Sequence, residues 1–310
     1  MSPTATRRKM TDARKHGALD EHIAQVVERA LEEDLGGVGL SAAADLTTAF
    51  VVDDMGSARA RILARAPGII AGGQVAEAVF RRLDGAVEVE VLTPDSSAAA
   101  PDQDVLAVAG PAGAILAAER TALNFLQRLS GVATMTRAFV DAVAGTGTQI
   151  TDTRKTTPGL RRLEKHAVRC GGGVNHRMGL YDAVLIKENH AATAGGVAAA
   201  VARARGSAAE RGMGQVRVMV EAETEDEVRA LVAASAQLRP DRILLDNMGL
   251  DQLRACVAAA REAAPSIELE ATGNMNLATA RAVAETGVDV ISVGALTHSA
   301  PALDLSLLFV

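Results

Sequence analysis

The 310-residue sequence predicts an α/β protein in two parts, a small α+β unit followed by a parallel α/β barrel. In the first part, short β-branched runs surround one helical stretch within residues 51–109. In the second part, short apolar runs alternate with Ala-rich helical stretches from residue 149 to 293, which is the pattern of βαβ units. Polar residues stand at the end of nearly every run in this second part.

The first part is expected to open with an amphipathic helix. Apolar residues at helical spacing predict it over Leu19–Leu35, and Gly36-Gly37 ends it. The expected strands and the helix between them are Ala58–Ala64, Gly68–Ala71, Val75–Leu83 (helix), Val87–Leu92 and Val105–Ala109. A long helical stretch over 113–144, broken at Gly131, follows them. Residues 1–18 are polar and irregular, and we expect a disordered leader there.

The second part is expected to repeat strand and helix. Its apolar runs are Gln149–Thr151, Ala183–Ile186, Val216–Val220, Arg242–Leu245, Ile267–Leu269 and Val290–Val293. The helices are expected at about 159–170, 191–209, 225–236, 250–263 and 276–286. Parallel strands closed into a barrel bring their carboxyl ends to one mouth, whereas an open doubly wound sheet spreads them along a line. The many polar strand ends favour the barrel, although only six or seven strands are visible.

Composition excludes several classes of protein. A net charge of -6 argues against a general nucleic-acid binder, and no apolar run is long enough to cross a membrane. No apolar segment of a signal peptide follows the basic residues near the N-terminus. Cys170 and Cys256 are far apart and fit no metal-ligand spacing, so we expect a reduced, cytoplasmic protein.

Five cationic side chains are expected near the barrel mouth: Arg154, Lys155, His176, Arg177 and Lys187. An arbitrary Arg-Lys pair is usually a solvated basic turn, and a lone Lys at a buried strand end is often part of a structural ion pair. All five lie on neighbouring strand ends or on the loops between them. Such a group requires an anionic ligand with several charges.

Glu221 and Asp246 each close an apolar strand at the same mouth. Such carboxylates hold Mg²⁺ together with substrate oxygens, or accept hydrogen bonds from ribose hydroxyls. The alternative is that they neutralise Lys187 and its neighbours, and both roles are compatible. Two small-residue turns, Thr272-Gly273-Asn274 and Val293-Gly294-Ala295, end the last strands and suit close approach of a phosphate to the backbone.

Other polar residues receive no role from the sequence. Arg120 lies in a helical segment ahead of the barrel and is indistinguishable from a surface Arg. Cys170, His166 and His190 are assigned to packing or to support of other residues, and His298 is left without a role.

Eight segments together resemble one family, quinolinate phosphoribosyltransferase. They are 118–131 (AERTALNFLQRLSG), 153–161 (TRKTTPGLR), 171–177 (GGGVNHR), 185–190 (LIKENH), 220–224 (VEAET), 243–247 (ILLDN), 270–274 (EATGN) and 291–298 (ISVGALTH). The similarity runs from about residue 20 to the end. Three positions depart from many relatives, Glu188, Glu223 and Thr272, but each keeps its charge or hydroxyl.

The resemblance implies an N-terminal α/β sandwich over 19–130 and an open, seven-stranded α/β barrel over 131–297. The C-terminal tail, 298–310, is a candidate to pack on the sandwich. It also implies a homodimer, or a hexamer of such dimers, in which Arg120 reaches into the neighbouring subunit's site. The implied reaction joins quinolinate and phosphoribosyl pyrophosphate into nicotinate mononucleotide, with Mg²⁺ as cofactor.

The family's site residues carry over to matching positions here. Arg154, His176, Arg177 and Lys187, with Arg120, are implied to bind the carboxylates of quinolinate. Lys155 is implied to lie between both substrates, and Thr153 beside them. Glu221 and Asp246 are implied to hold the ribose hydroxyls and the Mg²⁺–pyrophosphate end. The turns Thr272–Asn274 and Val293–Ala295 are implied to hold the 5′-phosphate, and Lys155, Lys187, Glu221 and Asp246 form the implied catalytic set.

Three alternatives stay open at this point. A related phosphoribosyltransferase could act on another acid, but the full set of cations favours a dicarboxylate, since unpaired buried charge is costly. A non-catalytic phosphate sensor on the same barrel would bind ligand without turnover. A phosphosugar aldolase or isomerase would use Lys187 as a Schiff-base amine.

Overall fold

The computed structural model describes residues 20–37, 39–52 and 56–310. The expected leader, 1–18, lies outside these residues, as does Leu19 at the start of the first expected helix, which is helical over 20–35. The chain divides into two compact units. The first contains residues up to Thr134 together with Thr157–Gly171 and Ala300–Val310, and the second contains Met135–Thr156 and Gly172–Ser299.

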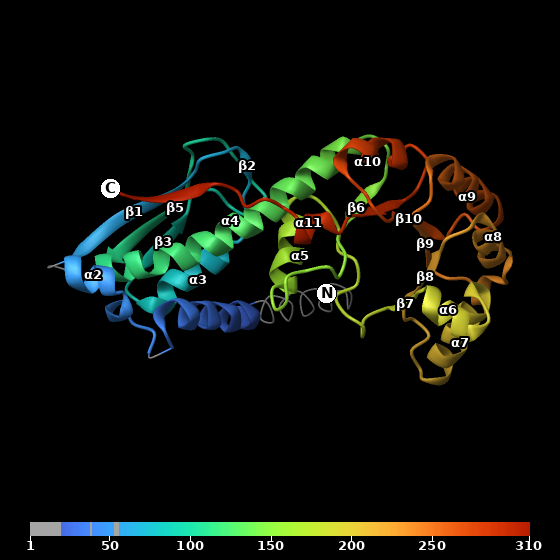
Figure 1. Ribbon diagram of the computed structural model, residues 1–310, viewed down its shortest axis with the longest axis horizontal. Helices are drawn as coiled ribbons and strands as arrows, with labels where there is room; N and C mark the ends of the chain where they lie inside the picture. The colour runs from blue at the N-terminus through green and yellow to red at the C-terminus, as the bar shows by residue number, and fades with distance from the viewer. Residues whose placement is uncertain (1–19, 38, 53–55) are drawn as a thin grey trace, which may run out of the picture. The chain divides into compact units, whose positions relative to one another are not determined.

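A four-stranded antiparallel sheet forms the centre of the first unit. Its order is β12 (Leu305–Phe309), β1 (Ser57–Ala64), β5 (Asp104–Pro111), β3 (Glu88–Val91). Two-residue strands β2 (Gly68–Ile69) and β4 (Ala98–Ala99) pair separately. Exposed and buried residues alternate along most of β1, as expected for a sheet with one covered face. Helix α3 (Gly73–Leu83) and the helix over 20–35 lie on the same side of this sheet, and short η1 (Ala42–Ala44) and α2 (Leu46–Val51) precede β1 (Figure 1).

Helix α4 (Ala112–Ala142) is continuous, so the predicted break at Gly131 is wrong. A side chain at Gly131 would collide with the carbonyl oxygen of Pro301, far below van der Waals distance. The glycine therefore permits close approach of the C-terminal segment to the helix. Glycine weakens a helix interior by about 1 kcal/mol without ending the helix.

Six parallel strands form the sheet of the second unit. Their order is β6 (Gln149–Thr151), β11 (Val290–Ser292), β10 (Glu268–Thr272), β9 (Arg242–Asp246), β8 (Val218–Ala222), β7 (Val184–Ile186). All five pairings are parallel. An isolated parallel bridge joins Thr151 to Val174, which places one residue where a seventh strand would add to the β6 edge. The strands β6 and β7 are the two edges of this sheet, and no pairing between Val174 and β7 closes it within the described residues. The predicted α/β fold class is confirmed.

Helices line the outside of this curved sheet (Figure 1). They are α6 (Glu188–Ala194), α7 (Val197–Glu210), α8 (Glu225–Ala233), α9 (Leu250–Ala263) and α10 (Leu277–Ala284), with η2 (Ala236–Leu238) before β9 and α11 (Ala295–His298) after β11. The expected single helix over 191–209 is two helices, because Gly195 and Gly196 have φ of 90° and 108° and break it. Thr224 and Glu227 form a capping box that starts α8.

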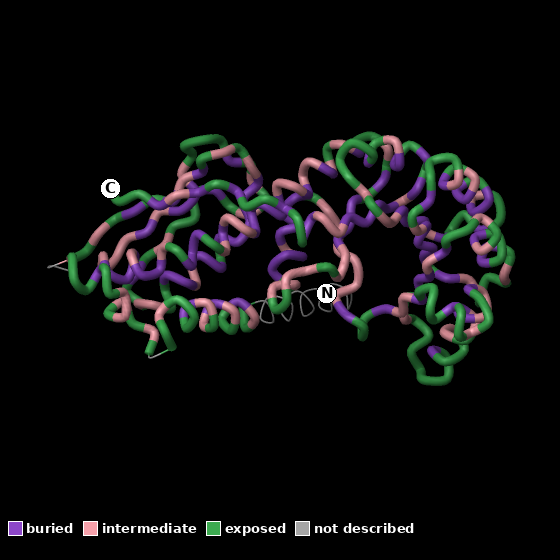
Figure 2. Tube along the Cα trace, in the orientation of Figure 1, coloured by how far each residue is buried: buried purple, intermediate pink, exposed green. Residues whose placement is uncertain are grey.

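Helix α5 (Arg161–Cys170) belongs to the first unit, although the strand–helix repeat predicts it beside the barrel. The strands of the second unit are largely buried and the outer turns of its helices are exposed (Figure 2). The central barrel strands β8, β9 and β10 are buried almost throughout, as expected for parallel strands covered on both faces. Among the helices within the described ranges, none has the length and apolar character needed to span a bilayer.

Candidate active site

A cavity of about 550 Å³ opens at the carboxyl ends of the barrel strands. It brings together most of the side chains that the sequence places at the mouth. These are Thr153, Arg154, Lys155, His176, Arg177, Lys187, Glu221, Asp246, Thr272, Gly273 and Asn274. The sequence did not assign five further lining residues to the site: Leu185, Leu244, Asn247, Glu270 and Ser292.

Four predicted residues do not line this cavity. Arg120 is exposed on α4, in the first unit. Val293 is buried, and its backbone N–H already donates to the carbonyl of Thr151 at 2.9 Å. Gly294 lies beside Lys155, since a Cβ on this glycine would be 3.1 Å from the Lys155 Cδ. The fourth, Ala295, begins the short helix α11.

Arg177 is the clearest anion-binding group in the cavity. Burial, followed by the neighbouring charge of Arg154, lowers the pKa of the Arg177 guanidinium. Its Nη1 donates to the carbonyl of Ala183 at 3.1 Å. Its buried Nε has no hydrogen-bond partner within the described part of the chain. Two adjacent guanidinium groups with an unsatisfied buried donor favour a bound carboxylate or phosphate.

Lys187 and Glu221 form an ion pair between the ends of β7 and β8. The Lys187 side chain is half exposed, whereas that of Glu221 is mostly covered. The backbone N–H of Lys187 donates to Nδ1 of His190 at 3.0 Å, so His190 helps to fix the turn that carries this lysine. The neutralising role considered for Glu221 is therefore present, and the lysine ammonium still borders the cavity.

The loop that carries His176 and Arg177 is fixed by Asp152, the residue after β6. Asp152 is fully buried. Its Oδ1 accepts the backbone N–H of His176 at 2.9 Å, and its Oδ2 accepts the side-chain amide of Asn175 at 2.6 Å. A buried carboxylate that accepts several N–H groups is held rigidly. It fixes the position from which Arg177 enters the cavity.

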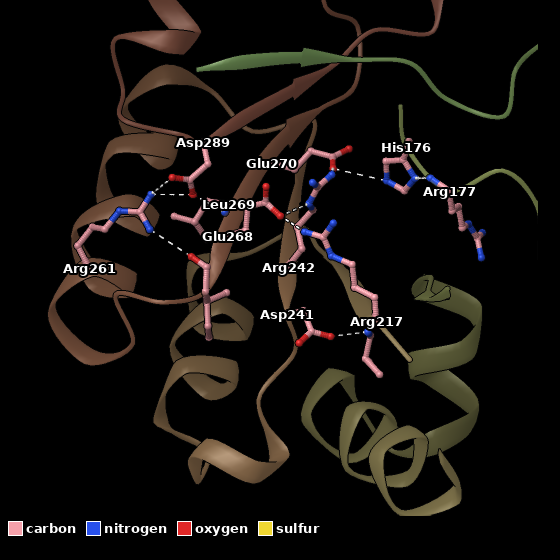
Figure 3. A network of polar contacts seen from close by, with 12 residues as sticks. His176, Arg177, Arg217, Asp241, Arg242, Arg261, Glu268, Leu269, Glu270 and Asp289 are labelled. Carbon is pink, nitrogen blue, oxygen red and sulfur yellow. Dashed lines mark hydrogen bonds and ion pairs between the residues drawn. The ribbon is translucent and has the colours of Figure 1, made fainter. Parts of the chain in front are cut away.

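A chain of alternating charges runs through the barrel from Arg217 to His176 (Figure 3). Arg242 contacts Glu268, with its Nε 2.9 Å from Oε2, and also contacts Glu270. Nε2 of His176 lies 3.5 Å from Oε2 of Glu270. Burial acts to raise the pKa of Glu270, but His176 and Arg242 hold it below its ordinary value.

His176 uses both ring nitrogens within the chain. Nδ1 accepts the backbone N–H of Arg177 at 2.8 Å, while Nε2 faces Glu270. In this arrangement the imidazole orients the Arg177 backbone and anchors the loop to the charge network.

Tight backbone geometry shapes the turn after β10. Gly273 has φ of 123°, and a Cβ there would overlap the side-chain oxygen of Asn247. Asn247 itself has φ of 53°, a left-handed conformation that Asn tolerates better than most residues. Its backbone N–H donates to the carbonyl of Thr272 at 3.0 Å. The two turns thus pack against each other with no room for a side chain at Gly273.

The acidic side of the cavity contains Glu221 and Asp246. Near it, desolvation and the charges of Glu188, Glu227 and Asp246 raise the pKa of the Glu223 carboxyl. Oxygen donors gathered in this way suit Mg²⁺, which uses one or two carboxylates and completes its shell with water and substrate oxygens. The residues present therefore fit a magnesium ion.

The barrel and its cavity define a class of protein, α/β barrels that bind a small polyanion at the carboxyl ends of their strands. Family models described as quinolinate phosphoribosyl transferase, N-terminal domain and C-terminal domain match residues 45–130 and 132–308. The chain belongs to the quinolinate phosphoribosyltransferase family, which confirms the resemblance read from the sequence.

Several known proteins are similar over most of their length. A probable nicotinate-nucleotide pyrophosphorylase [carboxylating] of Synechocystis is 43% identical over 80% of this chain and 82% of its own. The nicotinate-nucleotide pyrophosphorylase [carboxylating] of Mycobacterium leprae is 42% identical over 91% of this chain and 95% of its own. The solved structure of the nicotinate-nucleotide pyrophosphorylase from Francisella tularensis is 36% identical, covers 94% of this chain and 96% of its own, and gives a TM-score of 0.83.

Proposed function

We propose that this chain transfers the phosphoribosyl group of phosphoribosyl pyrophosphate to the ring nitrogen of quinolinate, with loss of the 2-carboxylate as CO₂. The products are nicotinate mononucleotide, CO₂ and pyrophosphate, a step of NAD biosynthesis. One observation carries the proposal: a single cavity holds Arg154, Lys155, Arg177 and Lys187 together with Glu221 and Asp246. Membership of the family supports it.

The cations suit the two carboxylates of quinolinate. Arg177 and Arg154 offer planar guanidinium groups, and Lys187 offers a point charge already oriented by Glu221. Arg120, exposed on α4, completes the site from a second copy of the chain in this proposal. His176 lines the same cavity as these cations and also orients Arg177, whose backbone N–H its Nδ1 accepts. Binding of this kind supplies proximity and orientation.

The carboxylates suit the ribose. Departure of pyrophosphate builds positive charge on the ribose ring, and Glu221 and Asp246 stabilise that charge electrostatically. Glu221 and Asp246 would also hold Mg²⁺ with substrate oxygens, and a bound magnesium ion would offset the negative charge of pyrophosphate. Lys155, exposed at the mouth and restrained beside Gly294, lies between the two substrates in this proposal.

The 5′-phosphate is assigned to the turn Thr272–Asn274 and to Gly294 and Ala295. Glycine at 273 allows close backbone approach, as anion-binding turns require. Val293 is not assigned a phosphate contact, because its N–H is already bonded to Thr151.

Decarboxylation follows once the bond between the ring nitrogen and ribose C1 has formed. The ring nitrogen donates its electron pair to ribose C1 and becomes positively charged. The electron pair of the bond to the 2-carboxylate then stays on ring C2 as CO₂ leaves, and C2 takes up a proton. The homodimer or hexamer, the Mg²⁺ requirement and the cytoplasmic location remain predictions.

The test is an incubation of purified protein with quinolinate, phosphoribosyl pyrophosphate and Mg²⁺, with product masses followed over time. Nicotinate mononucleotide is expected only when both substrates are present, and it should disappear in Lys187→Ala. Arg254→Ala, which removes an exposed charge on α9, should keep full activity. A folded protein that binds phosphate but makes no product would support the related-transferase or sensor alternatives.

A further inference from the structure

A cluster of three potential metal ligands lies in the first unit: Asp95, His166 and Cys170. Nε2 of His166 is 2.8 Å from Oδ2 of Asp95. The Cys170 sulfur lies 3.4 Å from the same Nε2 and 4.0 Å from the same Oδ2. The proposed reaction uses none of these residues. The proposed reaction therefore does not explain why these three side chains lie together.

We propose that Asp95, His166 and Cys170 form a site for a divalent transition-metal ion of the Zn²⁺ type. The site lies between α5 and the start of α3.

The distances fit such an ion. A point equally far from the three ligand atoms lies about 2 Å from each, close to zinc bond lengths of roughly 2.0–2.3 Å to nitrogen, oxygen and sulfur. His166 and Cys170 are four residues apart on α5 and therefore share one face of the helix. The site is open on one side, since the His166 and Asp95 side chains are 27% and 23% exposed. A water molecule completes the usual four-coordinate shell there.

The carboxylate is already oriented. Asp95 accepts the backbone N–H of Gly72 at 3.1 Å and of Gly73 at 3.0 Å, at the start of α3. Hydrogen bonds of this kind fix metal-binding carboxylates in other proteins. Without a metal, Asp95 still caps the start of α3. The experiment must therefore show that Asp95 binds a metal ion in addition to this simpler role.

Arg169 opposes metal binding in the present arrangement. Its Nη2 is 3.3 Å from Nδ1 of His166. Binding of a metal through Nε2 leaves the ring proton on Nδ1, so the exposed Arg169 has to turn away. Removal of the Arg169 side chain should therefore increase the affinity of the site for the metal ion.

The experiment uses the full chain and Co²⁺ as a spectroscopic probe for Zn²⁺. One equivalent of Co²⁺ should give the near-ultraviolet charge-transfer absorption of a cobalt–thiolate bond, and Zn²⁺ should abolish it by competition. Cys170→Ser should remove the band, and His166→Gln and Asp95→Asn should weaken Co²⁺ binding at least tenfold. Arg169→Gln should tighten it.

Two controls identify the sulfur and exclude the active site. Cys256→Ser removes the other cysteine, whose sulfur faces Met248, and Asp246→Asn alters the barrel cavity. Both should leave the band unchanged. A wild-type protein without the band, or a band that survives in Cys170→Ser, overturns the proposal and leaves Asp95 as a helix cap paired with His166. Neither result depends on catalysis, so failure here is distinguishable from failure of the proposed reaction.

Discussion

The side-chain amide of Asn175 donates a hydrogen bond of 2.6 Å to the buried carboxylate of Asp152 at the end of β6. The same carboxylate accepts the backbone N–H of His176, and His176 in turn accepts that of Arg177. The position of the Arg177 guanidinium thus depends on Asp152 and Asn175, which do not themselves line the cavity.

Asn175→Ala should therefore raise the KM for quinolinate about tenfold, since a hydrogen bond to a charged group contributes about 1.5 kcal/mol. The KM for phosphoribosyl pyrophosphate should change less than about twofold, because the turns assigned to its phosphate lie on other strands. Steady-state kinetics with each substrate varied in turn measures both. Equal increases would show that Asn175 supports the whole barrel mouth.

Arg177→Ala should raise the KM for quinolinate much more than that for phosphoribosyl pyrophosphate. Loss of a buried guanidinium that binds a carboxylate costs about 2 kcal/mol or more, which corresponds to at least about thirtyfold. Arg254→Ala serves as the matched control. Equal effects on both substrates would sink the assignment of Arg177 to quinolinate.

Gly273→Ala should impair use of phosphoribosyl pyrophosphate. The new Cβ would overlap Asn247 in a backbone conformation with φ of 123°, so the turn must move. We expect a fall in kcat/KM of about a hundredfold, since such strain costs a few kcal/mol. Gly249→Ala is the control, with φ of -71° and open space around its Cβ. Normal kinetics in Gly273→Ala would remove this turn from the phosphate site.

Acid should destabilise the barrel through Glu270. The folded-state pKa of this carboxyl lies below its ordinary value of 4.5, so its contribution is present above that value and is lost as pH falls through the folded pKa. Glu270→Gln should lower the free energy of unfolding at neutral pH by about 3 kcal/mol, because it leaves part of the charge of Arg242 uncompensated. It should also flatten the loss of stability as the pH falls below 4.5. Urea unfolding across that range tests this, and parallel curves for both proteins would contradict it.

Gly131→Ala should destabilise the protein by more than about 2 kcal/mol, because the added methyl group meets the Pro301 carbonyl. Gly206→Ala in α7, where nothing lies near the new Cβ, should instead stabilise by roughly 0.5–1 kcal/mol. Thermal unfolding of both variants checks the pair. Stabilisation by both substitutions would mean that Gly131 does not serve close packing.

The sequence predicted the barrel and the composition of its mouth because both follow from local rules. Apolar runs at βαβ spacing predicted the strands, and parallel strands necessarily bring their polar ends to one edge. Arg154, Lys187, Glu221 and Asp246 meet in one cavity for this reason.

What the sequence did not predict depends on register and on contacts between distant segments. Glu270 faces Arg242 only through the pairing of β10 with β9, and the ring of His176, which lines the cavity, also contacts Glu270 through Nε2. Gly131 resembles a helix break until Pro301 is placed beside it. Gly195-Gly196, in contrast, is a helix-breaking pair that can be recognised in the sequence. The helical pattern on both sides of it led to the prediction of one continuous helix.

The most direct measurement follows the carboxylate that is lost. Quinolinate labelled with ¹³C at the 2-carboxyl, incubated with the protein, phosphoribosyl pyrophosphate and Mg²⁺, should release labelled CO₂ in a one-to-one ratio with unlabelled nicotinate mononucleotide. Neither should form without phosphoribosyl pyrophosphate, and both should fall together in Lys187→Ala. Label retained in a nucleotide product, or CO₂ released without phosphoribosyl transfer, would contradict the proposed reaction.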